Sequence, residues 1–129
     1  MESVLWKGRI SVLWIFMAVS MSSHGVLSFM EPGAIEEIKE MAIGPGMLLF
    51  MALFWWVPLV MAFLSLSLKD AVNRKVNLLI GGIFTILNIV HFIEHLAQPS
   101  AHMILLIGSI AVATALIFWH AWKWPKKET

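Results

Sequence analysis

Residues 46–68 read GMLLFMALFWWVPLVMAFLSLSL and contain no charged side chain. At 1.5 Å per residue, a helix of this length crosses the roughly 30 Å hydrocarbon layer of a bilayer. Three more apolar runs of similar length occupy residues 10–30, 76–97 and 102–122. A backbone within lipid must satisfy its own hydrogen bonds, so each run is predicted to be a helix. The sequence therefore predicts an all-α, four-transmembrane-helix bundle that forms one integral membrane domain over residues 1–129.

The composition agrees with a membrane protein and excludes several other classes. Hydrophobic residues make up 60% of the chain and charged residues 13%, too few to cover a soluble domain of this size. The lipid bilayer is therefore the first expected partner. The net charge is +1 and the basic residues lie at helix ends, so no nucleic-acid binding is expected. The chain has no cysteine, which excludes disulfide exchange, thiolate metal sites and cysteine nucleophiles.

The basic residues predict the orientation in the membrane. When four crossings are threaded, eight of the nine basic residues fall on one side, and Lys39 alone falls on the other. By the positive-inside rule the side with eight is cytoplasmic, which predicts an N-in/C-in protein of the cell (cytoplasmic) membrane. The eight residues are Lys7, Arg9, Lys69, Arg74, Lys75, Lys123, Lys126 and Lys127.

Two connections of unequal length lie on the predicted outer side. Residues 98–101 form a tight turn, whereas residues 31–45 form a longer and acidic connection. Within the longer one, Ile35 and Ile38 recur at helical spacing and charged residues occupy the other face. This pattern predicts a short amphipathic segment in the first outer loop. It serves either as a lid over the bundle or as a solvated connector.

Inside the second run, Pro58 predicts a kink, because its ring removes one helical hydrogen bond. Trp55 and Trp56 lie just before it and either line a cavity or pack against neighbouring helices. Near the predicted inner boundary, Asn73, Asn77 and His120 are interpreted as interfacial. The same boundary is predicted to hold tryptophans that anchor the helices. These are Trp6, Trp119, Trp122 and Trp124.

The third run contains the residues with the clearest chemistry. His91, Glu94 and His95 form an H-x-x-E-H pattern, HFIEH. Positions i and i+4 share one face of a helix, so both histidines can bind one metal ion with the carboxylate beside them. The same order occurs in inverted zinc-peptidase motifs, where the carboxylate is the general base. Those enzymes are much larger and soluble, so the sequence favours a role without catalysis.

The depth of the histidines adds a second reason to expect a site. His24 and His91 each lie six residues before the outer end of their predicted helices, about 9 Å below the boundary. His95, His102 and Glu31 lie closer to that boundary. Ionisable groups within a span usually face a partner or a water-filled cavity. The candidate metal ligands are therefore His24, His91, Glu94, His95 and His102.

Three functions remain open from the sequence. The first is a non-enzymatic helix-packing protein or subunit of a membrane complex, expected to form a homo-oligomer because so short a chain encloses little space. The second is an intramembrane protein that binds a metal ion, or a haem held between two imidazoles at one depth. The third is a proton-coupled carrier of a small solute, since histidine titrates near neutral pH.

Two familiar four-helix families do not fit. Small multidrug exporters need an acid embedded in the first helix, and the first run has none before Glu31. Vitamin K epoxide reductase-like enzymes need paired cysteines, which this chain lacks.

Short motifs along nearly the whole chain resemble an uncharacterised family of small prokaryotic four-helix membrane proteins, a domain of unknown function. The resemblance implies a prokaryotic cytoplasmic membrane and no established activity. The chain departs from it at His120, where tyrosine is expected, and H-x-x-E-H is not a hallmark of the family. The motifs are Leu13-Trp14-Ile15-Phe16, Leu27 through Met30-Glu31-Pro32-Gly33, Asn73-Arg74 and Ala121-Trp122-Lys123-Trp124.

Overall fold

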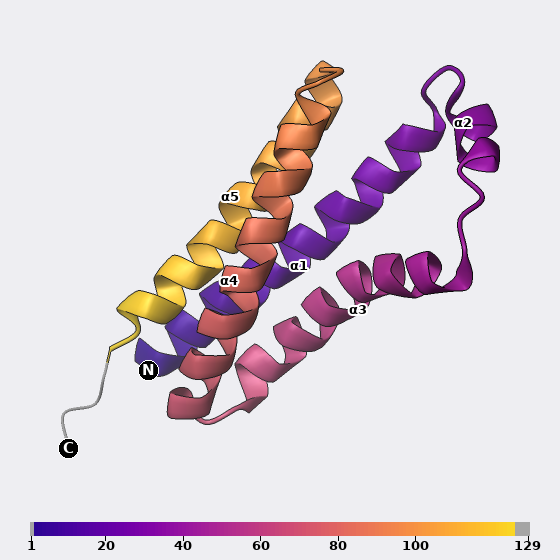
Figure 1. The fold of residues 1–129 in the computed structure, drawn as a ribbon. Helices are drawn as coiled ribbons and strands as arrows, with labels where there is room; N and C mark the ends of the chain where they lie inside the picture. The colour runs from indigo at the N-terminus through magenta and orange to yellow at the C-terminus, as the bar shows by residue number, and fades with distance from the viewer. Residues whose placement is uncertain (1, 126–129) are drawn as a thin grey trace.

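The computed structural model describes residues 2–125, and these residues form helices and short connections without a strand. Four of the helices are long and apolar enough to cross a membrane, and a short helix lies between the first and second of them (Figure 1). The predicted four-helix bundle with a short segment in its first long loop is therefore confirmed. The helices are α1 (Glu2–Phe29), α2 (Ala34–Glu40), α3 (Pro45–Ser67), α4 (Asp70–His95) and α5 (Ala101–Lys123).

Two helices extend beyond the apolar runs that predict them. α1 begins at Glu2 rather than near residue 10, and α4 begins at Asp70 rather than near residue 76. Each added segment carries three charged residues, which is why hydropathy alone does not mark it. Each starts with an acidic residue, which the positive end of the helix dipole favours. The Nζ atom of Lys7 lies 3.1 Å from a carboxylate oxygen of Asp70 and links the two added segments.

The start of α1 and the end of α5 lie at one end of the bundle, which we call the termini end. α2 and the connection from α4 to α5 lie at the opposite end, the α2 end (Figure 1). Lys39 belongs to α2. Lys126 and Lys127, which also enter the predicted orientation, lie outside the described residues. The other basic residues occupy the first three turns of α1 or α4, the connection from α3 to α4, or the last position of α5.

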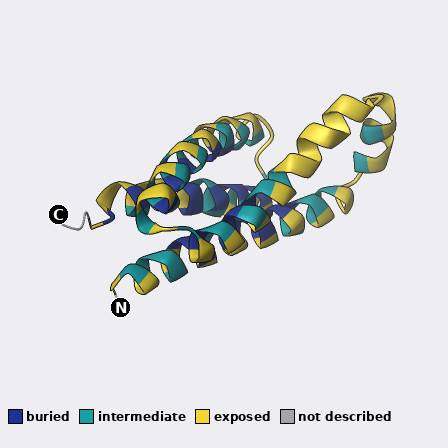
Figure 2. Ribbon diagram, turned by 90° about the horizontal axis from the view of Figure 1, so that it is seen from below, coloured by how far each residue is buried: buried dark blue, intermediate teal, exposed yellow. Residues whose placement is uncertain are grey.

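The helices do not pack evenly. α1 packs along both α3 and α5, and α5 packs along α4, but α3 and α4 make few contacts. α3 and α4 diverge towards the α2 end (Figure 1). Residues 44–53, at the start of α3, are all exposed (Figure 2). One side of the bundle is therefore open between α3 and α4.

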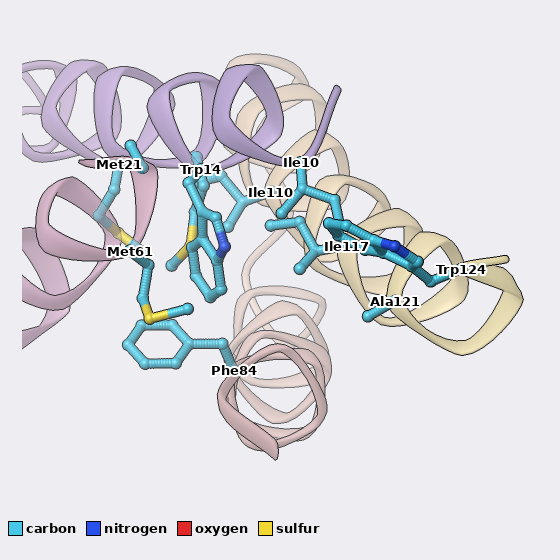
Figure 3. Packing of buried hydrophobic residues seen from close by; sticks show 11 residues of the cluster. Ile10, Trp14, Met21, Met61, Phe84, Ile110, Ile117, Ala121 and Trp124 are labelled. Carbon is cyan, nitrogen blue, oxygen red and sulfur yellow. The ribbon is translucent and has the colours of Figure 1, made fainter. Parts of the chain in front are cut away.

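The core lies where all four long helices meet. Trp14 of α1 packs edge-on against Phe84 of α4 with ring centroids 5.6 Å apart, and Met61 of α3 lies beside both rings (Figure 3). The cluster continues between α1 and α5 through a set of smaller aliphatic residues and Trp124. Trp124 is only 4% exposed, so it is part of the core rather than the interfacial anchor that the sequence suggests. The whole cluster comprises Ile10, Trp14, Met17, Met21, Met61, Ala62, Phe84, Ile110, Ile117, Ala121 and Trp124.

A buried polar network lies next to this core, nearer the termini end. Asn77 accepts a hydrogen bond from Trp14 Nε1 at 2.7 Å and donates to Asn73 Oδ1 at 2.7 Å. Asn73 donates in turn to the Ser65 carbonyl at 2.6 Å. Both asparagines are fully buried, so they belong to the interior of the bundle, which their predicted position near the inner boundary does not indicate. Their amides join α1, α3 and α4, which is how polar side chains link helices in lipid.

Gly81 sets the spacing between α4 and α5. A Cβ atom at this position would lie 2.9 Å from Ile117 Cγ2 and 3.4 Å from the backbone nitrogen of Phe118. At the neighbouring Gly82, a Cβ atom would approach only the Phe118 ring, at 3.4 Å. Small residues at such crossings allow two helices to approach closely.

We therefore expect Gly81→Ala to lower the free energy of unfolding by about 1–3 kcal/mol through overpacking against α5. Gly82→Ala is the matched control, because it gains the same helix propensity and displaces only a ring edge. Reversible unfolding in mixed micelles, followed by circular dichroism, measures both. Equal stability of the two variants would show that the backbone contact at Gly81 does not determine the helix spacing.

Candidate metal centre

Three histidines from two helices meet at the α2 end. His91 and His95 lie one turn apart on α4, and His24 on α1 faces both of them. The Nε2 atoms of His24 and His91 are 3.3 Å apart. The ring centroid of His95 lies 5.2 Å from that of His24 and 4.7 Å from that of His91. One ring nitrogen from each histidine lies within 4.8 Å of the other two, so the three can bind a single ion.

The distances suit a small tetrahedral ion. With metal–nitrogen bonds of about 2.0–2.1 Å, the ligand nitrogens of such an ion lie about 3.3–3.4 Å apart. The separation of His24 and His91 has this value. The widest separation among the three nitrogens is at most 4.8 Å, so a metal ion would require it to shorten by at most about 1.5 Å, a distance on the scale of a rotamer change. A haem would hold His24 and His91 on opposite faces of its porphyrin, whereas the ring of His95 lies beside both of their rings.

The outer nitrogens of two of these rings also have partners. His91 Nδ1 lies 3.7 Å from Glu94 Oε2, and His24 Nδ1 lies 2.9 Å from the sulfur of Met103. Ser28 Oγ is 3.5 Å from the same nitrogen of His24. A carboxylate on the far nitrogen of a histidine orients the ring and raises its basicity as a metal ligand. Glu94 therefore lies beside the cluster, on the side of His91 that faces away from His24.

The structure does not bring His102 into the cluster. Its Nε2 atom lies 3.0 Å from Glu31 Oε1, and both side chains are nearly half exposed. Ser100 Oγ donates to the same carboxylate oxygen at 3.4 Å, so Glu31 connects the end of α1 to the start of α5. His120 lies at the termini end, where its ring contacts Trp6 at a centroid distance of 5.3 Å. Of the five candidate ligands, three therefore converge, Glu94 is adjacent and His102 is elsewhere.

A groove of about 910 Å³ lies beside the histidines, between α1, α3 and α4 at the α2 end. We call it the lateral groove. His24 is only 8% exposed, and its exposed part, like that of His91, faces this space. Trp55 lines the groove and also packs against the core, so both interpretations of that residue hold, whereas Trp56 is exposed and does not line the groove. Its walls include Gly25, Ser28, Phe54, Trp55, Val90 and Glu94.

Asn88 is a further polar residue on this part of α4. It lies two turns from His95 on the same helix face and is fully buried. Neither atom of its amide has a hydrogen-bond partner among the described residues. Buried polar groups in proteins are almost always paired, so the unpaired amide of Asn88 is unusual.

Comparisons of the chain with protein-family models, with curated proteins and with solved structures find no match. The class defined by the fold is a multi-pass helical membrane protein. The resemblance to small prokaryotic four-helix proteins stays a prediction. A function must therefore be argued from the histidine cluster and its surroundings.

Proposed function

We propose that this multi-pass membrane protein binds a divalent transition-metal ion, of which Zn²⁺ is the simplest case, through His24, His91 and His95. The observation that carries the proposal is the convergence of three imidazole nitrogens within 4.8 Å of one another. Imidazole is a preferred ligand of zinc and copper, and neutral histidine is the form that binds. Two adjacent histidines can be explained by a hydrogen bond between their rings. A third imidazole at the same point is better explained by binding of a metal ion.

The site is incomplete as a structural zinc centre, because three protein ligands leave one tetrahedral position open. We place that position towards the lateral groove, because His24 and His91 line it. Sites of this kind take water or a small molecule as the fourth ligand. Glu94 lies at the outer nitrogen of His91 rather than at the open position, so we assign no general base and propose no hydrolytic reaction.

The orientation and setting are part of the same proposal. Both termini lie in the cytoplasm and the histidine cluster lies in the outer half of a prokaryotic cell membrane, as the positive-inside rule favours. A role as a homo-oligomer or complex subunit is a second candidate, because residues 44–53 of α3 present an exposed apolar surface. A proton-coupled carrier is less favoured. The apolar contact of Trp14 and Phe84 separates the histidines from the asparagine network at the other end of the bundle.

Metal binding is tested with protein purified in detergent through a tag that contains no histidine. The protein is dialysed against Zn²⁺, and the bound metal is counted by elemental analysis. We expect about one ion per chain, and Co²⁺ in its place should show the visible absorption of a tetrahedral site. Zinc content no higher than that of a detergent blank would overturn the proposal.

A further inference from the structure

We propose that the lateral groove binds a neutral amphiphile from the bilayer, with one hydrocarbon tail and a head that carries hydroxyl or carbonyl oxygens. The groove has the size of a binding site for a small organic molecule, since such sites measure about 300–1,000 Å³ and this one about 910 Å³. Its walls are mostly apolar and rich in aromatic rings. Those from α3 and α4 include Phe50, Phe54, Trp55, Leu59, Leu87 and Val90.

The groove is accessible from the lipid side. α3 and α4, which form two of its walls, make few contacts and diverge towards the α2 end (Figure 1). Val90 on one wall and Phe50 on the other are both about half exposed. A molecule dissolved in the bilayer therefore reaches the groove sideways, without passing through water. This entry route favours a lipid-soluble ligand.

The polar atoms of the groove define the head group. His24, His91 and Glu94 all line it, whereas the α3 wall is apolar apart from the indole N–H of Trp55. A purely apolar occupant, such as a helix of a second copy, would cover the exposed carboxylate of Glu94 without offering it a hydrogen-bond donor. The carboxylate of Glu94 disfavours an anionic head. A hydroxyl can donate to Glu94 and accept from an imidazole, so a neutral oxygen-bearing head matches all three residues.

This inference goes beyond metal binding and does not need a bound ion, although the open coordination position of the proposed metal faces the same space. The two proposals can therefore fail separately. Loss of metal binding with the amphiphile retained would count against the metal site alone, and the reverse result would count against the groove alone.

The probe is monooleoylglycerol, a single-tailed lipid with an uncharged glycerol head. Its binding to the detergent-purified protein is counted by native mass spectrometry. Val90→Trp fills the groove, and Ser22→Phe fills it from the α1 side. Ile86→Trp is the matched control, because Ile86 is exposed one turn away on α4 and does not line the groove.

We expect the wild type and Ile86→Trp to bind monooleoylglycerol equally, and each groove-filling variant to bind it at least about 10-fold more weakly. Zinc content and helicity of the variants serve as the check that they fold. Unchanged binding in both Val90→Trp and Ser22→Phe would overturn the groove as the site. To metal-free protein, oleate, which has the same tail and an anionic head, is expected to bind about 10-fold more weakly than monooleoylglycerol, and equal binding would overturn the assignment of a neutral head.

Discussion

Replacement of His91 and His95 together by alanine is expected to weaken Zn²⁺ binding by more than about 100-fold. The double variant removes two of the three ligands and leaves His24 as a single imidazole, whereas loss of one outer-shell partner alone already costs about 10–100-fold. Competition with a coloured chelator in detergent measures the affinity. Both histidines are partly exposed, so the substitutions remove little packing and the fold is expected to persist.

His102→Ala is the control for this experiment. His102 lies at the same end of the bundle, but its ring pairs with Glu31 and not with the cluster. Its removal should leave zinc affinity within about twofold of the wild type, because no coordinating atom is lost. A similar drop in affinity for both variants would mean that zinc binds to exposed histidines in general. In that case the three-histidine centre would have to be abandoned.

The sequence predicts the helices well because a long apolar run has few alternatives in a bilayer. It also predicts that His24 and His91 lie level with each other in the bundle, since position along a helix follows from counting residues at a fixed rise, and their contact confirms this. It does not predict where α1 and α4 begin, because hydropathy marks the lipid-buried part of a helix and not its polar first turns. Asp70 and Glu2 therefore extend the helices beyond the expected boundaries.

The sequence does not determine which helices and side chains contact one another. The spacing of His91 and His95 places them on one face, but which helix that face meets depends on the packing of the whole bundle. His24 meets that face through its side chain, although α1 packs along α3 and α5 rather than along α4. Met103 and His102 follow each other in sequence and point to different partners, His24 and Glu31. No short motif carries that information.

Asn73 and Asn77 show that the sequence also does not give the burial of a residue within the bundle. Both lie close to a predicted boundary, where polar side chains cost little, and a one-dimensional count therefore places them in the interface. In the bundle they are fully buried, because the polar first turns of α4 are covered by α1 and α3. Depth along the membrane normal and burial within the protein are separate quantities, and the count gives only the first.

Asn77→Leu is expected to lower the free energy of unfolding by about 2–3 kcal/mol. Leucine has a similar volume, so the cost comes from lost hydrogen bonds rather than from a cavity. The Trp14 indole would lose the acceptor that lies 2.7 Å away, and Asn73 Oδ1 would lose its donor. Hydrogen bonds between helices contribute about 0.6–1.7 kcal/mol each in membranes, and an unpaired buried donor adds to the loss.

Asn88→Leu is the matched control, because it makes the same substitution on the same helix at an equally buried position. Its amide has no hydrogen-bond partner among the described residues, so replacement removes a desolvated polar group without breaking a contact. This variant should be as stable as the wild type or more stable by about 1 kcal/mol. Equal losses in Asn77→Leu and Asn88→Leu, measured by unfolding in mixed micelles, would mean that the hydrogen bonds of Asn77 do not stabilise the bundle. A difference of the expected sign would mean that the network around Asn77 helps to hold α1, α3 and α4 together.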